Sequence, residues 1–239
     1  MIMKLNINDR AALAIKNNTK RVEIRANKEN SEHDYSKLRQ NDIIEFTSNN
    51  LGVFYVKVKE VNCYDSLDEL FILEGTRYVT LSINDEDITK LRKKCVYAIH
   101  IEYLYSENTV WEELYEKAKN VRNKKDISGM ISSGGVSAAI LTKDHNIYTG
   151  VCIDTASTLG MCAERNAIAN MITNGESEII KLVCIDSKGN VGLPCGACRE
   201  YLMQLSKSSK NIEILKDIDS KEIVKLDELI PGWWGYDRV

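Results

Sequence analysis

The sequence predicts two domains: a small α+β domain over residues 1–105, then an α/β sandwich with a mixed, partly parallel sheet over residues 106–239. Three observations support this division. Short alternating β-rich runs dominate the first part. In the second part, apolar strands alternate with helix-length segments of the kind that connect parallel strands. A polar stretch after Tyr105 separates the two parts, and 239 residues are enough for two ordinary domains.

The first part contains three strand-like runs and two helix-like segments. Alternating apolar residues predict strands at 42–48, 52–61 and 95–105. Helices are predicted at 8–17 and 85–94, each after an Asn or Asp that can cap it. This pattern indicates a small antiparallel sheet or barrel.

The second part begins with an amphipathic helix that starts near Trp111, the predicted packing anchor of that helix. A Gly/Ser-rich patch follows, and then a hairpin is predicted from "VSAAILT" and "IYTGVCI". Two further helices are predicted, "MCAERNAIANMITNG", which ends at Gly175, and the segment from Cys195 to Leu205. Strands are predicted at "EIIKLVCID", "NIEIL" and "EIVKL".

Composition excludes several classes of protein. The net charge is −3, and neither half has the large basic excess that non-specific binding to a phosphate backbone requires. No apolar run is long enough for a membrane span, and the N-terminus lacks the apolar region of a signal peptide. Seven cysteines without an export signal favour free thiols or metal ligands over a disulfide framework, so a cytoplasmic location is expected.

Three cysteines have the spacing of a metal site. Cys195 and Cys198 lie three positions apart in the first turn of a predicted helix, and Pro194 stiffens its entry. Cys162 begins the other long helix. Because helix N-termini favour thiolates, these sulfurs suit a zinc ion and leave its fourth tetrahedral position open for a water.

Glu164 follows Cys162 by two residues, where a carboxylate can move protons without ligating the metal. This arrangement is the deaminase signature of a zinc ligand, a Glu and a later Pro-Cys-x-x-Cys. Three thiolates over-neutralise zinc, so a nearby cation is expected to offset their charge. Arg165 and Arg199 are the candidates, and Arg165 is preferred.

The motifs "CAERNAI" and "PCGACREYL" resemble those of the cytidine deaminase family, in its small three-cysteine branch. The resemblance runs from residue 109 to the C-terminus and implies a three-layer α/β/α sandwich. It further implies one zinc per chain on Cys162, Cys195 and Cys198, zinc-bound hydroxide as the nucleophile, and Glu164 as the proton shuttle. Active sites completed across subunits imply a homodimer or homotetramer. The predicted function is therefore zinc-dependent hydrolytic deamination of a cytidine-like nucleoside.

The chain departs from that family where the substrate binds. Gly134 stands where members that accept plain cytidine have an aromatic residue, and Cys152 and Asp154 replace the Asn and Glu that hold the ribose. The stretches "VSAAILTKDHNIYTGV" and "ELIPGWWG" are more similar to blasticidin S deaminase. The substrate could thus be cytidine, deoxycytidine or a modified or antibiotic analogue such as blasticidin S. Trp233 or Trp234 is expected to close over it, in its own or a neighbouring subunit.

The first domain resembles the ASCH domain, a relative of the PUA RNA-binding barrel. The resemblance rests on "AIKNNTKRVEIRAN", "LRQNDIIEF" and "VKVKEVNCYDSLDELF". It implies a small α+β, β-barrel-like fold and a cleft for a nucleotide or RNA. The residues expected at that cleft are Lys20, Arg21, Glu23 and Arg25.

Two other readings of the sequence remain open. One is an RNA-binding protein whose deaminase half edits or senses modified cytidine in RNA. The other is a non-catalytic scaffold with structural zinc, whose fourth ligand would come from His145, Cys152 or Cys184. Cys63, Cys95 and Cys184 are expected to be small core residues, whereas His33 and His100 receive no role.

Overall fold

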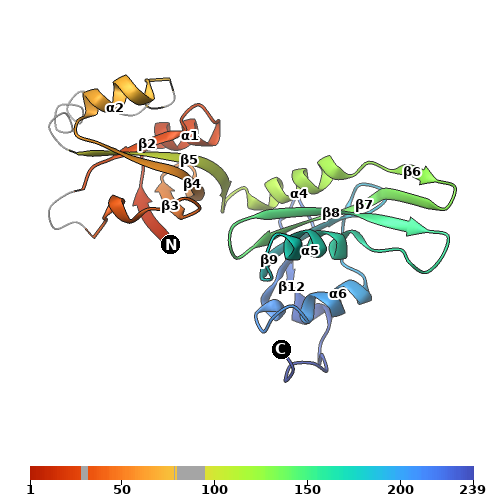
Figure 1. Cartoon of the computed structure of the whole chain (residues 1–239). Coiled ribbons are helices and arrows are strands. Elements are labelled where there is room, and N and C mark those ends of the chain that lie inside the picture. Colours follow the sequence, from red (N-terminus) through yellow and green to blue (C-terminus); the bar gives the residue numbers. More distant parts are fainter. Residues whose placement is uncertain (28–31, 78, 80–94) are drawn as a thin grey trace. The chain divides into compact units, whose positions relative to one another are not determined.

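The structure is a computed structural model that describes residues 1–27, 32–77, 79 and 95–239. It divides into two compact units, Met1–Asn108 and Thr109–Val239 (Figure 1). Both mix helices with a sheet, as predicted. The helix predicted at 85–94 lies outside the described residues. Within them, no helix is both long and apolar enough to cross a membrane.

The first unit is built on a five-stranded sheet. Its elements are β1 (Ile2–Asn6), α1 (Asp9–Lys16), β2 (Val22–Arg25), a 3-10 turn (Tyr35–Lys37), β3 (Ile43–Ser48), β4 (Gly52–Tyr64), α2 (Leu67–Glu74) and β5 (Val96–Ser106). The strand order is β1-β3-β4-β5-β2, in which only β1 and β3 run parallel. In the described residues the two end strands pair with no further strand, so no closed barrel is seen. The three predicted strands and the helix at 8–17 are confirmed, whereas β1, β2 and α2 were not predicted from periodicity.

The core of the first unit forms between the sheet and α1. Phe46 on β3 and Phe54 on β4 are paired in register, fully buried, and stack with ring centroids 5.4 Å apart. Ala12 and Ile15 of α1 belong to the same core. The Asn8 side chain caps α1 by accepting a hydrogen bond from the Ala11 amide at 2.8 Å. Burial of each phenylalanine contributes about 2–3 kcal/mol, which fixes the β3–β4 register.

The predicted core position of two cysteines in this unit is wrong. Cys63 lies near the end of β4 and Cys95 directly precedes β5, and both are exposed. Their strand-like surroundings suggested burial, but both thiols lie on the solvent side of the ladder. Cys184 of the second unit is buried, as predicted.

The second unit contains a mixed sheet and four helices in its described part. Its elements are α4 (Val110–Val121), β6 (Lys125–Ser128), β7 (Ile131–Thr142), β8 (Ile147–Thr155), α5 (Ala163–Thr173), β9 (Ile179–Ile185), β10 (Val191–Gly192), α6 (Gly196–Met203), a 3-10 turn (Ser209–Asn211), β11 (Glu213–Leu215), β12 (Ile223–Lys225) and α7 (Leu226–Leu229). The strand order is β12-β11-β9-β7-β6, with β8 also on β7 and β10 on β9. The pair β9–β11 is parallel and is connected through α6. The predicted hairpin and both predicted helices are confirmed.

Alternation along β9 places helices on both faces of this sheet. Leu182 and Cys184 share a core with residues of α5 and α6. On the opposite face, the Lys181 ammonium lies 4.8 Å from the ring centre of Trp111 on α4. The second unit is therefore layered as helix, sheet and helices (Figure 1).

Gly150 determines how closely α5 approaches the sheet. A Cβ at Gly150 on β8 would lie 2.3 Å from the Ala167 amide nitrogen and 2.4 Å from the Ala163 carbonyl oxygen, both in α5. Only glycine permits this contact between two backbones. It holds the first turn of α5, which follows Cys162, against the hairpin of β7 and β8.

Candidate active site

Three cysteines from two helix starts converge in the second unit. Cys162 is the N-cap of α5, Cys195 is the N-cap of α6, and Cys198 lies in the first turn of α6. The Sγ atoms of Cys162 and Cys195 are 3.7 Å apart, those of Cys195 and Cys198 are 3.5 Å apart, and all three lie within 4.8 Å of one another. Sulfurs about 2.3 Å from a tetrahedral zinc are separated by about 3.8 Å, so this group fits zinc.

No fourth side chain joins these sulfurs in the part of the chain that the structure describes. A three-ligand group leaves one tetrahedral position for a water or substrate, which is typical of catalytic zinc sites. It gives no support to the structural-zinc reading, which needs a fourth protein ligand.

Arg165 is the cation next to the sulfurs. Its Nη2 lies 3.9 Å from the Cys162 Sγ, and this contact raises the pKa of Arg165. Burial raises the pKa of Cys162, while Arg165 opposes that shift. Arg199 instead donates to the carbonyls of Pro194 at 2.8 Å and Leu229 at 3.1 Å. Of the two candidates, Arg165 is therefore the one in contact with a sulfur.

Glu164 lies in the first turn of α5, is only 4% exposed, and lines a cavity of about 670 Å³. The Cys184 thiol is its neighbour: burial first, and then the charge of Glu164, raise the pKa of Cys184 well above its usual range. A thiol that stays protonated beside Glu164 adds no second negative charge. The cavity therefore presents one buried carboxylate next to the sulfurs.

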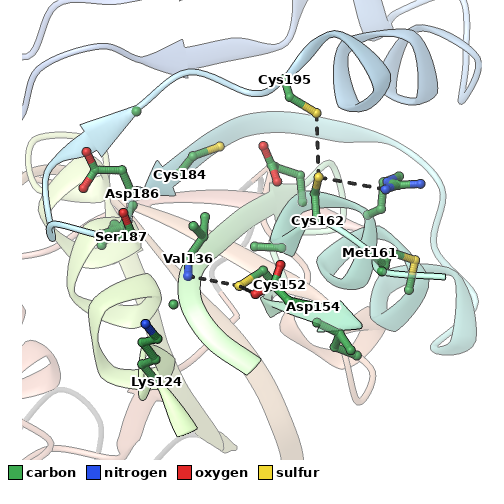
Figure 2. Close-up of a pocket in the computed structure, with 18 of the residues that line it drawn as sticks. Lys124, Val136, Cys152, Asp154, Met161, Cys162, Cys184, Asp186, Ser187 and Cys195 are labelled. Carbon is green, nitrogen blue, oxygen red and sulfur yellow. Dashed lines mark hydrogen bonds between the residues drawn. The ribbon is translucent and has the colours of Figure 1, made fainter. Parts of the chain in front are cut away.

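The same cavity is lined by Cys152 and Asp154 of β8 (Figure 2). The Cys152 Sγ accepts a hydrogen bond from the Val136 amide at 3.2 Å and donates to Asp154 Oδ2 at 3.4 Å. Cys152 is buried, whereas Asp154 is exposed. The two residues that the sequence predicts at the sugar-binding position thus contact each other and line the cavity.

Gly134 adopts a positive φ of +76°, and a Cβ there would lie 2.1 Å from the Asn123 carbonyl oxygen. The backbone of residue 123 therefore occupies the space that a side chain at 134 would need. The main chain therefore excludes an aromatic residue at this position. The glycine that the sequence analysis singled out is required by the fold.

Trp233 and Trp234 are both hydrogen bonded to Glu200, at 2.7 Å and 3.1 Å. Trp233 is buried in the core, whereas Trp234 is 63% exposed and carries Arg238 4.7 Å from its ring centre. Neither lines the cavity of its own chain. A contact of Trp234 with a neighbouring subunit's substrate stays a prediction.

In the first unit, two of the four predicted cleft residues, Lys20 and Arg25, contact the carboxylate of a third, Glu23. Lys20 is 2% exposed, and its Nζ contacts Glu23 at 3.3 Å and the Val22 carbonyl at 2.8 Å. Arg25 Nε lies 2.9 Å from the other Glu23 oxygen. Arg21 bonds instead to Asn18 on the surface. The cluster is thus an internal ionic group, and Lys20 and Glu23 do not lie on a solvated strand face.

Sequence reasoning missed Lys124, Asp186 and Ser187, which line the cavity with the predicted residues (Figure 2). Asp186 follows β9, and its carboxylate accepts the amides of Lys188 and Asn190 at 2.8 and 2.9 Å. Polar residues directly after a buried strand, such as Asp186 and Ser187, could have been recognised in the sequence as candidate site residues. Lys124 stands in a charged run, where nothing in the sequence distinguishes it.

Comparison with known proteins identifies the family. Residues 109–212 match the cytidine and deoxycytidylate deaminase zinc-binding region. The chain is 32% identical over 103 residues to the cytidine deaminase of Mycobacterium tuberculosis, covering 43% of this chain and 74% of that protein. The chain belongs to the cytidine deaminase family.

Other cytidine deaminases align over similar lengths. That of Sporosarcina psychrophila is 30% identical over 126 residues, which are 51% of this chain and 88% of that protein. The crystal structure of the Mycobacterium tuberculosis cytidine deaminase aligns with 26% identity and a TM-score of 0.44, over 53% of this chain and 98% of that one. As a member of the family with a three-cysteine group, this protein is a zinc-dependent hydrolytic deaminase with one zinc per chain.

Proposed function

We propose that the protein removes the exocyclic amine of a cytidine-like nucleoside, with zinc held by Cys162, Cys195 and Cys198. The observation that carries this proposal is a buried glutamate that lines one cavity together with Cys162 and Cys195, two of the three converging cysteines. The substrate is cytidine, deoxycytidine or a modified or antibiotic analogue such as blasticidin S. When bound, zinc supplies the Lewis acidity that activates water near neutral pH.

Glu164 is the proposed proton shuttle. Its carboxylate takes a proton from the attacking water and transfers it to the ring nitrogen. It then takes the remaining proton of the hydroxyl that has added to the ring carbon and gives it to the amine, which departs as ammonia. Its position on the first turn of α5 keeps it beside the sulfurs without joining them. Arg165 keeps its charge against Cys162 and offsets the excess negative charge of three thiolates.

Cys152 and Asp154 are the proposed contacts for the sugar. Asp154 can accept hydrogen bonds from sugar hydroxyls, and Cys152 orients it by donating to Oδ2. We expect a homodimer or homotetramer in which Trp234 closes over the substrate of its own or a neighbouring subunit. Size-exclusion chromatography that finds a fully active monomer would refute this assembly.

The test is ammonia release by the zinc-loaded protein from cytidine, deoxycytidine, N4-acylated cytidine and blasticidin S. Glu164→Gln is expected to lower turnover of the accepted substrate about 100- to 10,000-fold while zinc stays bound. Glu116→Gln, an exposed glutamate on α4, is the matched control and should leave the rate unchanged. Wild-type rates in Glu164→Gln would remove the residue from the mechanism.

For the first unit we infer an ASCH-like domain whose cleft includes Lys20, Arg21, Glu23 and Arg25. Its support is the buried ionic cluster around Glu23. RNA or nucleotide affinity that disappears in Arg21→Ala or Lys20→Ala would establish this role. Affinity that is unchanged in Arg21→Ala and in a folded Lys20→Ala would place the ligand elsewhere or remove it.

A further inference from the structure

Cys63 and Cys95 form a pair of adjacent thiols in the first unit, whereas the three-cysteine group belongs to the second. Their Sγ atoms are 2.7 Å apart, and both residues are exposed. Because a disulfide bond is about 2.05 Å long, less than about 1 Å of movement separates the two thiols from a bond.

The antiparallel ladder of β4 and β5 brings the two cysteines together. Cys63 pairs with Tyr97 and Tyr64 pairs with Val96, so Cys95 reaches the ladder two positions before Tyr97. Side chains two positions apart on a strand point to the same face, which places the Cys95 thiol diagonally across from Cys63. The backbone pairing of two strands therefore maintains the contact.

The chemistry of this pair differs from metal binding. Among the described residues, no third histidine, cysteine or carboxylate joins it to make a ligand group. Two accessible, adjacent thiols instead have the arrangement that undergoes thiol–disulfide exchange.

We propose that Cys63 and Cys95 are a modification site that forms a reversible intramolecular disulfide by exchange with low-molecular-weight disulfides of the glutathione class. The Cys63 thiolate attacks one sulfur of the small disulfide, which forms a mixed disulfide and releases one small thiol. Cys95 then loses its proton and displaces the second small thiol. The protein dithiol is oxidised, the small disulfide is reduced to two thiols, and atoms and electrons balance.

The hydrogen bond between the two thiols sets the order of these steps. The hydrogen bond to Cys63 is the larger cause and burial the second, and together they raise the pKa of Cys95 to about 11. A thiol with so high a pKa is a poor first nucleophile near neutral pH, so we assign the second step to Cys95. In the mixed disulfide, Cys63 no longer has the thiol whose hydrogen bond raises the pKa of Cys95, so the second step is eased.

The test is incubation of the full-length, zinc-loaded protein with oxidised glutathione, followed by peptide mapping. The expected product is a Cys63–Cys95 crosslink two hydrogens lighter than the dithiol, which dithiothreitol reverses. Hydrogen exchange at the β4–β5 ladder is expected to slow at least about tenfold on oxidation, because the crosslink fastens the ends of both strands.

Cys63→Ser and Cys95→Ser are the matched variants, and each should retain zinc and deaminase activity. Cys63→Ser should form no intramolecular crosslink, and Cys95→Ser should accumulate the mixed glutathione disulfide at Cys63. A stable glutathione adduct in the wild type without a crosslink would overturn the proposal. So would a crosslink that joins either thiol to Cys195.

Discussion

The chain contains two groups of neighbouring cysteines that serve different chemistry. Cys162 and Cys195 are the N-caps of two helices, and Cys198 lies in the first turn of the second. Cys63 and Cys95 lie at the ends of two paired strands. Helix starts provide amides and partial positive charge that support several thiolates at once, whereas strand ends provide none. Three features therefore distinguish the metal site from the proposed redox-active pair: the helix-start backbone around its thiols, a third sulfur, and the nearby Arg165.

Replacement of a zinc ligand should have the largest effect, and it tests whether the two cysteine groups are independent. Cys198→Ser is expected to reduce bound zinc to well below one per chain and deamination at least about 1,000-fold, because two thiolates hold zinc poorly. Metal analysis and ammonia release are the measurements. Cys63→Ser, with the same chemical change, should retain both. Zinc loss in Cys63→Ser would mean that the two groups are not independent.

Arg165→Ala tests whether the guanidinium belongs to the metal group. Zinc affinity is expected to fall about 10- to 100-fold, since a partner of a ligand sulfur is removed while all three sulfurs remain. Competition with a chromogenic chelator measures this. Arg165→Lys, which keeps the charge, should recover part of the affinity, and an unchanged affinity in Arg165→Ala would contradict the assigned role.

The pH dependence of alkylation tests the exposed pair. The neutral Cys95 thiol is stabilised by its hydrogen bond to Cys63, so its pKa is raised to about 11. Iodoacetamide should therefore modify Cys95 with a midpoint near pH 11 in the reduced protein. In Cys63→Ala the largest cause is removed while burial stays, and the midpoint should move down toward the ordinary thiol range of about 8.5. Peptide-resolved mass spectrometry follows both proteins, and identical midpoints would exclude the coupling.

Cys184 is a third kind of cysteine, a buried core thiol, and its replacement is expected to have the smallest effect. It is 3% exposed in the core of the second unit. Cys184→Ala is expected to lower the free energy of unfolding by about 1 kcal/mol, through lost packing, with one zinc still bound. Chemical denaturation of the zinc-loaded protein measures it. Loss of the metal in a folded Cys184→Ala would show that this thiol is a ligand after all.

These differences also explain which parts of the fold and of the site could be predicted from the sequence. The zinc group was recognisable because short spacings, such as Cys195 to Cys198, place side chains on one helix turn. The strands from Ile43 to Tyr64 were recognisable from their alternation. Both signals are local in the chain.

What was missed depends on tertiary position. The exposure of Cys63 and Cys95 follows from which face of the β4–β5 ladder meets the core, and apolar alternation around them did not reveal it. Lys124 and Asp186 reach the cavity from segments far apart in the sequence. The short strand β2 lacks the length over which a period can be recognised.

The main chain at Asn123, which fills the space beside Gly134, limits how this enzyme can evolve. Any residue larger than glycine at position 134 must first displace the Asn123 carbonyl, so this position is closed to ordinary substitution. Variation of the cavity is open at residues that line it, such as Lys124 in the loop after α4 or Cys152 and Asp154 on β8.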